Sequence, residues 1–445
     1  MNINYGIKCI VCKSTINLRM QAGRISKNEI RFNCPKCGIP INITLEFVHK
    51  KDDFNINPII KNAEFIDGFK DLDYAIQCSS EFFTTKNVIN PYKLLEDESE
   101  YVPKELLSPF MQANSFLGKN LTLFSNHCYR IAENIEYLNV FERLNTLYYF
   151  KSQYFIMHMN EFFKENGIER KVEDSEISKF ENIYYFNIRY LNEFLKMNEF
   201  SEINKEIVSD IQEIQKVNKS QLYKVIEKLV LNGELELYEK KIIKLIRIYI
   251  SKFKFLIPAI SIEYLRKDIY IKDIYKDYTM RTCTFDDIRN IYSEVYENII
   301  DIYDCIAVLN NVYYRNDYEK FKLLKDIKNV PYKIKTNKNL TVNNLLDFKL
   351  LNKGLKLYYI KDDEEKFNKY MPKLENYLRN SLAHESWNYD EENQIIKYED
   401  KIKGKTEEHS LLEYANECYN LFVKLVSIYK ILMDLKNIYL KNIKK

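Results

Sequence analysis

The chain has 445 residues, of which 46% are hydrophobic and 29% are charged, and its formal net charge is +3. This composition is that of a globular protein. The small net charge excludes a surface that is basic throughout, so a nucleic-acid site has to be local. The length exceeds what one hydrophobic core usually serves and predicts two or three domains.

The sequence contains neither an export signal at its start nor an apolar stretch typical of a membrane-spanning helix. The first residues, MNINYGIKCIVC, lack the basic and then apolar stretches of a secretory signal. The longest apolar stretch, Ile242 to Ile262, is interrupted by four basic residues and predicts a buried helix. The nine cysteines suit a reducing compartment, because four form two pairs and the rest are scattered. We therefore expect a cytoplasmic protein without a membrane partner.

The first 49 residues contain two Cys-x-x-Cys pairs, formed by Cys9, Cys12, Cys34 and Cys37. Each pair predicts a tight turn. A β-hairpin between the pairs would bring four thiolates together on one structural Zn²⁺ per chain. Strand-like runs at Glu29–Phe32 and Ile41–Phe47 fit this arrangement, and residues 5–48 resemble a zinc ribbon. Two disulfides or a redox pair are the alternatives. The ribbon could bind RNA, bind a partner protein or stabilise a small domain, and the sequence does not distinguish these roles.

The middle of the chain changes character near residue 116. Residues 50–115 contain four prolines and one extended run, Tyr74 to Thr85, and predict an irregular connector with some strand content. Residues 116–283 have helical apolar spacing and predict a helical middle domain. Breaks are expected at Gly167 and near Asn232 and Gly233.

Residues 284–445 predict a separate unit of four helices. Thr284 and Asp287 form a capping-box-like start signal. One apolar face follows it, consisting of Ile288, Ile291, Val295, Ile302, Ile306 and Leu309. The last helix carries an apolar seam with alternating steps of four and three, namely Leu411, Ala415, Cys418, Phe422, Leu425, Tyr429 and Leu432. That seam packs either within the chain or across subunits.

One polar segment stands out within this unit, Arg379-Asn380-Ser-Leu-Ala-His384. On a helix, Leu374, Tyr377, Leu378, Ser381 and Leu382 gather on one side. Arg379, Asn380, Ala383 and His384 then lie on the opposite side. The small Ala383 would let another chain approach closely, and Asn380 could orient the imidazole of His384 one turn away.

This segment resembles the Arg-Asn-x-x-x-His motif of the HEPN superfamily, and the resemblance covers residues 284–445. It implies a HEPN-like helical bundle in a mainly α protein. It also implies metal-independent endoribonuclease activity in a homodimer formed through this bundle, as in toxins and bacterial abortive-infection or other antiphage systems. The implied catalytic residues are Arg379, His384 and Asn380, with RNA as partner. The products would carry 2′,3′-cyclic phosphate and 5′-hydroxyl ends.

The residue types suit this chemistry. His384 can move protons near neutral pH, and Arg379 is a permanent cation that stabilises phosphorane charge. The two side chains lie roughly 140° apart on one helix, so a two-fold dimer would supply a complete set in one cleft. Two alternatives stay open: a surface ion pair of Arg379 with Glu375, and a non-catalytic adaptor that binds RNA or a protein partner. An activating or inhibitory protein partner also stays open.

A lysine-rich segment at 320–339 is the candidate RNA-binding surface, through Lys322, Lys325, Lys328, Lys333 and Lys335. A solvated linker between helices is the ordinary alternative. Trp387, the single tryptophan, either stacks on a base or packs at the end of a helix.

Overall fold

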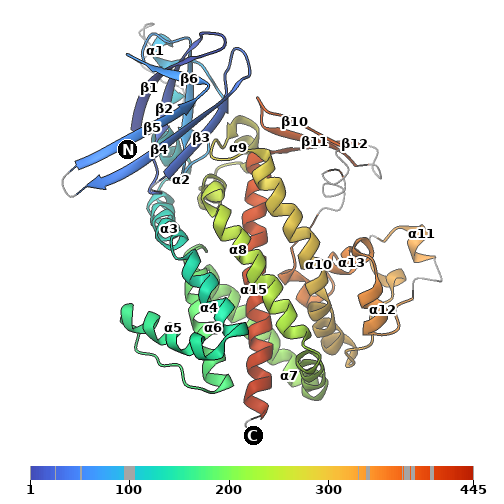
Figure 1. Ribbon diagram of the computed structural model, residues 1–445. Coiled ribbons are helices and arrows are strands. Elements are labelled where there is room, and N and C mark those ends of the chain that lie inside the picture. The colour runs from blue at the N-terminus through green and yellow to red at the C-terminus, as the bar shows by residue number, and fades with distance from the viewer. Residues whose placement is uncertain are drawn as a thin grey trace. The chain divides into compact units, whose positions relative to one another are not determined.

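The computed structural model describes residues 2–25, 27–50, 53–94, 106–328, 330–336, 341–372, 374, 381, 386–400 and 405–443. These residues are mainly helical, with a β region at the N-terminus (Figure 1), as the sequence predicts. The chain divides into two compact units. The first unit is Met1–Ile135, Ile250–Ile291 and Asn380–Tyr419, and the second is Glu136–Tyr249, Tyr292–Arg379 and Asn420–Lys445.

Two sheets form the N-terminal part of the first unit. The larger sheet has the strand order β6-β1-β2-β7, with β1 at Asn2–Cys9, β2 at Thr15–Gln21, β6 at Ala63–Ile66 and β7 at Tyr74–Ser79. The other has the order β3-β4-β5, with β3 at Lys27–Asn33, β4 at Pro40–Lys50 and β5 at Asp53–Lys61. Buried residues of both sheets form one hydrophobic cluster.

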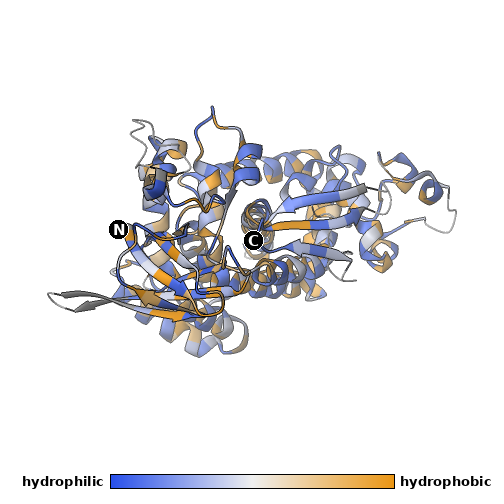
Figure 2. Ribbon diagram, turned by 90° about the horizontal axis from the view of Figure 1, so that it is seen from above, coloured by the Kyte–Doolittle hydropathy of each residue, from blue (hydrophilic) through white to orange (hydrophobic). Residues whose placement is uncertain are grey.

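The sequence pattern explains the second sheet directly. In β3, buried side chains alternate with more exposed ones, as expected for a strand with one face in the core. The first half of β4 continues this alternation from Ile41 to Leu45. Hydrophobic and hydrophilic residues likewise interleave along the helices and strands (Figure 2).

The strand content predicted for 50–115 is confirmed, since the extended run Tyr74 to Thr85 contains β7 and β8 (Thr84–Thr85). The irregular character predicted for this connector is wrong for most of its described residues. Strands β5, β6 and β7 belong to the two sheets, and β7 pairs with β2 in parallel. The prolines misled the prediction because Pro58 lies in β5, an edge strand, where a residue without an N–H is tolerated. The parallel pairing of β2 with β7 has no local sequence signal.

Helices and short strands complete the first unit. Its further helices are α1 (Pro91–Leu94), α2 (Pro109–Leu117), α3 (Asn120–Ile135), η2 (Ser261–Tyr264) and α9 (Ile271–Asp277). β8 (Thr84–Thr85) pairs with β9 (Tyr278–Thr279). The last strands form one antiparallel sheet, β10 (Trp387–Asp390), β11 (Ile395–Asp400) and β12 (Lys405–Ser410). Strands β10 and β11 form an antiparallel hairpin.

The second unit consists of helices in its described residues. They are α4 (Leu138–Phe150), α5 (Ser152–Glu165), α6 (Glu176–Asn192), α7 (Glu199–Leu231), η3 (Leu324–Asp326), α11 (Tyr332–Lys335), α12 (Leu345–Leu350), α13 (Lys353–Ile360) and η4 (Lys366–Tyr370). The expected helix breaks at Gly167 and at Asn232 and Gly233 are confirmed.

Three long helices contribute residues to both units: α8 (Glu234–Ile260), α10 (Phe285–Arg315) and α15 (Leu411–Ile443). The expected domain boundary at 284 is therefore not observed, because residues on both sides of it belong to the first unit. The capping box at the start of α10 is confirmed. The Thr284 N–H donates to Asp287 Oδ2 over 3.0 Å, and the Asp287 N–H donates to Thr284 Oγ1 over 3.4 Å.

The unit expected at 284–445 is not a simple four-helix bundle. Between α10 and α15 the described residues form short helices and a three-stranded sheet. The apolar face predicted for α10 and the seam predicted for α15 are both buried within the single chain, each member being at most 1% exposed. The seam is thus explained without a second subunit.

Candidate functional site

Two tight turns carry the four paired cysteines. Cys9 ends β1 and Cys12 lies in the turn to β2. Cys34 and Cys37 lie in the turn between β3 and β4. The expected hairpin between the pairs is absent, because β2 and β3 belong to different sheets. Each pair instead forms the turn of its own hairpin, and the packing of the two sheets brings the turns together.

The two turns have the same backbone hydrogen bonds. In the first, the Cys9 N–H donates to the Ser14 carbonyl over 3.0 Å, and the Lys13 N–H donates to the Cys9 carbonyl over 3.1 Å. In the second, the Cys34 N–H donates to the Ile39 carbonyl, and the Gly38 N–H donates to the Cys34 carbonyl, both over 2.9 Å. This repeated geometry presents two sulfur atoms from each turn.

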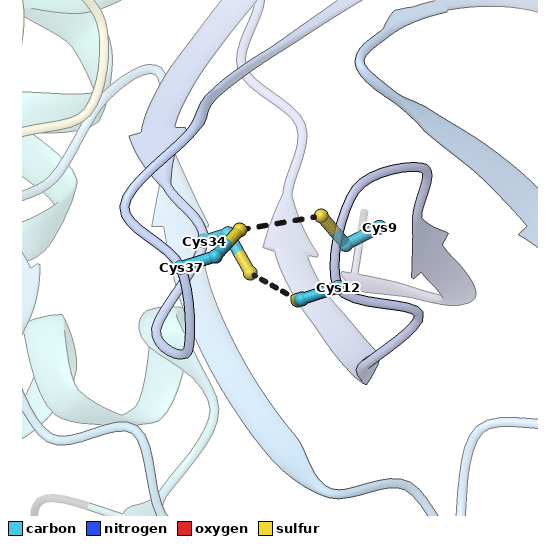
Figure 3. Close-up of side chains that lie close together, drawn as sticks. All are labelled: Cys9, Cys12, Cys34 and Cys37. Atoms are coloured by element: carbon cyan, nitrogen blue, oxygen red, sulfur yellow. Dashed lines mark hydrogen bonds between the residues drawn. The ribbon is translucent and has the colours of Figure 1, made fainter.

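The four sulfur atoms lie within 4.8 Å of one another (Figure 3). Across the turns, Cys9 Sγ lies 3.7 Å from Cys37 Sγ, and Cys12 Sγ lies 3.6 Å from Cys34 Sγ. A disulfide needs about 2.05 Å, so these cysteines are not bonded to each other. Four thiolates around a tetrahedral Zn²⁺ with Zn–S bonds of about 2.3 Å lie about 3.8 Å apart. The observed separations therefore fit a tetrahedral metal site.

Ser14 favours the thiolate form of Cys12. Its hydroxyl Oγ lies 3.0 Å from Cys12 Sγ and 3.4 Å from Cys34 Sγ. The hydrogen bonds from the Ser14 side chain and backbone lower the pKa of the Cys12 thiol to about 6. Because thiolates are the form that binds zinc, this contact favours metal binding at Cys12. The pKa of Cys37 is raised instead, to about 12, because the lowering effect of the Ile39 backbone hydrogen bond is outweighed by desolvation and by hydrogen bonds with the other cysteines.

The cluster lies at the edge of the hydrophobic core. Cys9 and Cys34 are buried, Cys12 is partly buried and Cys37 is exposed. The buried cysteines pack with the residues of both sheets, so the site would connect the sheets at one end. Four sulfur ligands fill a tetrahedral coordination shell, and such a site holds structure without an open position for a substrate.

The predicted catalytic residues Arg379, Asn380 and His384 lie outside the described residues, as does Ala383. Two members of the face predicted to be buried, Leu374 and Ser381, are described. They are 0% and 4% exposed, which agrees with the burial predicted for these two positions, although Leu374 does not lie in a helix.

Trp387 is the first residue of β10 and packs at the end of a helix, as one of the two hypotheses had it. Its ring centroid lies 4.8 Å from that of Phe285, the first residue of α10. The Arg289 guanidinium lies 5.4 Å from the Trp387 ring. The Trp387 indole therefore packs against other residues of the first unit.

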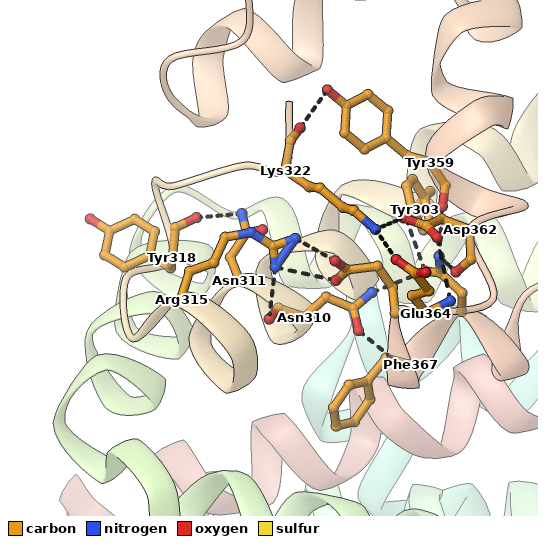
Figure 4. Close-up of polar contacts among 12 residues, drawn as sticks. Tyr303, Asn310, Asn311, Arg315, Tyr318, Lys322, Tyr359, Asp362, Glu364 and Phe367 are labelled. Carbon is orange, nitrogen blue, oxygen red and sulfur yellow. Dashed lines mark hydrogen bonds and ion pairs between the residues drawn. The ribbon is translucent and has the colours of Figure 1, made fainter. Parts of the chain in front are cut away.

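The lysine-rich segment is not a uniform RNA-binding surface. Lys322 Nζ donates to Asp362 over 2.6 Å and to Glu364 over 2.8 Å, within a larger polar network (Figure 4). Lys328 pairs with the same Glu364 over 2.7 Å. Their charge is thus balanced by acidic residues that follow α13 in sequence, which the sequence analysis did not pair with them.

The remaining three lysines of the segment are more accessible. Lys325 and Lys333 are exposed and Lys335 is partly buried. Among the described residues they form no ion pair. Of the predicted RNA-binding set, these three remain candidates.

The first unit contains a further polar site that the sequence did not predict. Arg281, which follows β9, is a buried cation beside the turn of Cys34 and Cys37. Its neighbours come from three segments far apart in the sequence, so no motif marks it. A lone arginine in the stretch Thr279 to Thr284 matches no sequence motif.

No helix among the described residues is both long and apolar enough to cross a membrane. In comparisons with known proteins, no family model, no curated protein and no solved structure matches this chain. The function is therefore argued from the chain's own residues.

Proposed function

We propose that this protein is an endoribonuclease in which Arg379 and His384 cleave RNA, and that Cys9, Cys12, Cys34 and Cys37 hold one structural Zn²⁺. The zinc site is supported by the distances between sulfur atoms of the two turns, which are 3.6 and 3.7 Å. The nuclease activity is supported by the Arg-Asn-x-x-x-His segment at 379–384, which resembles the HEPN motif. An antiphage or toxin role is the setting that this resemblance suggests.

In this mechanism the RNA supplies its own nucleophile. His384 takes the proton from a 2′-hydroxyl, and the oxygen attacks the adjacent phosphorus. The guanidinium of Arg379 stabilises the negative charge of the phosphorane, and a second His384, from a partner subunit, protonates the leaving 5′ oxygen. Asn380 orients the imidazole. The products are a 2′,3′-cyclic phosphate and a 5′-hydroxyl, and every proton removed is returned.

The zinc would act on structure alone. The two turns that supply the thiolates lie in different sheets, so a bound ion would connect them and stabilise the folded first unit. No step of RNA cleavage is assigned to it.

The test incubates RNA with the purified protein in EDTA, under conditions in which zinc analysis verifies that the protein still holds its metal. We expect cleavage of RNA, with DNA of the same sequence left intact because it lacks the 2′-hydroxyl. Arg379→Ala and His384→Ala should each lower the rate on the order of 10²-fold or more. Asn380→Ala should have a milder effect.

Two matched controls separate chemistry from stability. His158→Ala removes a partly exposed histidine of α5 that contacts Glu161, and Arg266→Ala removes an arginine that pairs with Asp268. Both should retain the wild-type rate. Cleavage that persists in Arg379→Ala and His384→Ala contradicts the mechanism. RNA binding without any cleavage would instead support the adaptor alternative.

A further inference from the structure

Arg281 is a buried cation whose side chain forms one hydrogen bond with the described part of the chain. The residue is 9% exposed, and its Nε donates to the Gln77 carbonyl of β7 over 3.1 Å. Its own carbonyl accepts a hydrogen bond from the Arg31 N–H of β3 over 2.8 Å. The backbone is thus fixed between elements of the first unit, and the position of the guanidinium follows from it.

The guanidinium lacks a counter-ion among the described residues. It offers five N–H donors, of which only the Nε–H has a partner there. No described carboxylate lies within ion-pair distance of it. A buried charge without a partner is costly, and proteins rarely retain one without a use for it. The Gln77 carbonyl does not require Arg281, since Thr84 Oγ1 also donates to it, over 2.9 Å.

Arg281 lines a cavity of about 430 Å³, which we call the Arg281 pocket. The pocket lies beside the turn of Cys34 and Cys37, and its walls come from β3, from residues 281–285 and from β10 and the turn after it. Its basic side chains are Arg31, Lys36, Lys86 and Arg281, and its acidic ones are Glu391 and Glu392.

The other charges of the pocket are already partly engaged. Arg31 pairs with Asp287 over 3.1 Å, and Glu391 accepts from Asn33 Nδ2 over 2.7 Å. Among the described residues, Lys86 Nζ donates to the Lys276 carbonyl over 2.8 Å and feels the nearby charges of Asp277 and Asp390. Lys36 is exposed to solvent, so Arg281 is the buried cation of the pocket for which the described residues provide no carboxylate.

We propose that the Arg281 pocket binds the phosphate group of a ligand about the size of a nucleotide. The planar donors of arginine match phosphate oxygens in pairs, and Lys86 would add a second charge. Pockets of about 300–1,000 Å³ suit small organic ligands. Phe285 and Tyr389, stacked with ring centroids 4.9 Å apart, supply an aromatic wall for a base. This inference does not rest on the ribonuclease proposal.

The test measures thermal unfolding and calorimetric binding with five probes: inorganic phosphate, AMP, UMP, adenosine and a short 5′-phosphorylated RNA. A ligand that binds the folded state raises its melting temperature. We expect AMP or UMP to raise it and adenosine, which lacks the phosphate, to leave it unchanged. A response to RNA with none to the mononucleotides would assign the phosphate to an RNA strand. A response to inorganic phosphate alone would show that the ligand is smaller than proposed. If no phosphate compound raises the melting temperature, the pocket is not a phosphate site.

The variants Arg281→Met and Lys86→Met identify the site. Each should weaken binding on the order of 10-fold or more. Without ligand, Arg281→Met should unfold at the same or a higher temperature, because it removes an uncompensated buried charge while Gln77 keeps its bond from Thr84. The exposed Arg266→Met is the matched control and should bind as wild type does. If Arg281→Met unfolds at a lower temperature and binding persists in it and in Lys86→Met, then Arg281 is a structural cation and the proposal is wrong.

Discussion

Lys13 and Gly38 occupy equivalent positions, each directly after the second cysteine of its pair, and both have left-handed backbone conformations, with φ of 62° and 74°. In each turn the N–H of this residue donates back to the first cysteine. The turn thus demands a positive φ whatever the residue. Glycine meets this demand without strain, whereas lysine does so at a cost.

Gly38→Ala should therefore destabilise the protein by about 1 kcal/mol, although a methyl group there would meet no atom within 4 Å. Lys13→Gly should be neutral or stabilising, because relief of the strained backbone offsets the added freedom of the unfolded chain. Urea unfolding measures both. Gly354→Ala, in helix α13, is the control and should stabilise by about 0.5–1 kcal/mol. If Gly38→Ala is as stable as the wild type, the turn does not require a left-handed backbone conformation at residue 38.

Purified protein should contain one zinc per chain. Cys34→Ser and Cys37→Ser should lose it, since each removes one of four ligands, and a strong chelator should lower the melting temperature of the wild type. Metal analysis and calorimetry check both effects. Cys128→Ala, a buried cysteine outside the cluster, should keep its zinc despite any loss of packing. Zinc that is absent from the wild type, or retained in both serine variants, would disprove the site.

The protein should form a homodimer, because the proposed cleavage needs two copies of Arg379 and His384 in one cleft. Light scattering at micromolar concentration gives the mass per particle, with an expected value of twice that of the chain. Replacing Ala383 by Trp should favour the monomer and lower the cleavage rate together, since a bulky side chain would block the approach of a second chain. A monomer with full activity would rule out the shared cleft.

In the second unit, Glu239 and Lys436 form an ion pair over 2.7 Å in which Glu239 is fully buried and Lys436 is partly buried. Burial raises the pKa of Glu239, against the opposing effect of Lys436. Lys436→Met should destabilise by about 3–5 kcal/mol, because it leaves the carboxylate buried with only Tyr149 as a polar partner. The double variant with Glu239→Gln should recover part of this loss in denaturant unfolding. Additive effects of the two changes would show that the pair is not coupled.

Glu364 should titrate at low pH. The hydrogen bonds from Lys322 first, and Lys328 second, lower its pKa from 4.5 to about 2. Its contribution to stability is thus complete above pH 4.5 and is lost as the pH falls toward 2. NMR titration of the Glu364 carboxyl measures the pKa directly. Lys322→Met should raise it more than Lys328→Met does, and a value near 4.5 in the wild type would contradict the contacts.

The features predictable from the sequence are those with a local signal. The cysteine spacing predicted the cluster, the Thr284 and Asp287 pair predicted the start of α10, and apolar periodicity predicted the buried face of α15. The features missed depend on residues far apart in sequence. Strand β7 pairs with β2 across more than fifty residues, Lys322 finds its carboxylates after α13, and Arg281 meets Gln77 from a distant strand. No periodicity or motif encodes such pairings, because tertiary packing selects them.

The parallel pairing of β2 with β7 also bears on the order in which the first unit folds. All four paired cysteines precede residue 40, whereas the strand that completes the sheet of the first pair begins at Tyr74. As the chain leaves the ribosome, the metal ligands are available while the outer edge of β2 still has no neighbour. Such an open edge pairs readily with other chains. A fragment that ends near residue 49 would therefore retain every zinc ligand and yet be prone to aggregation.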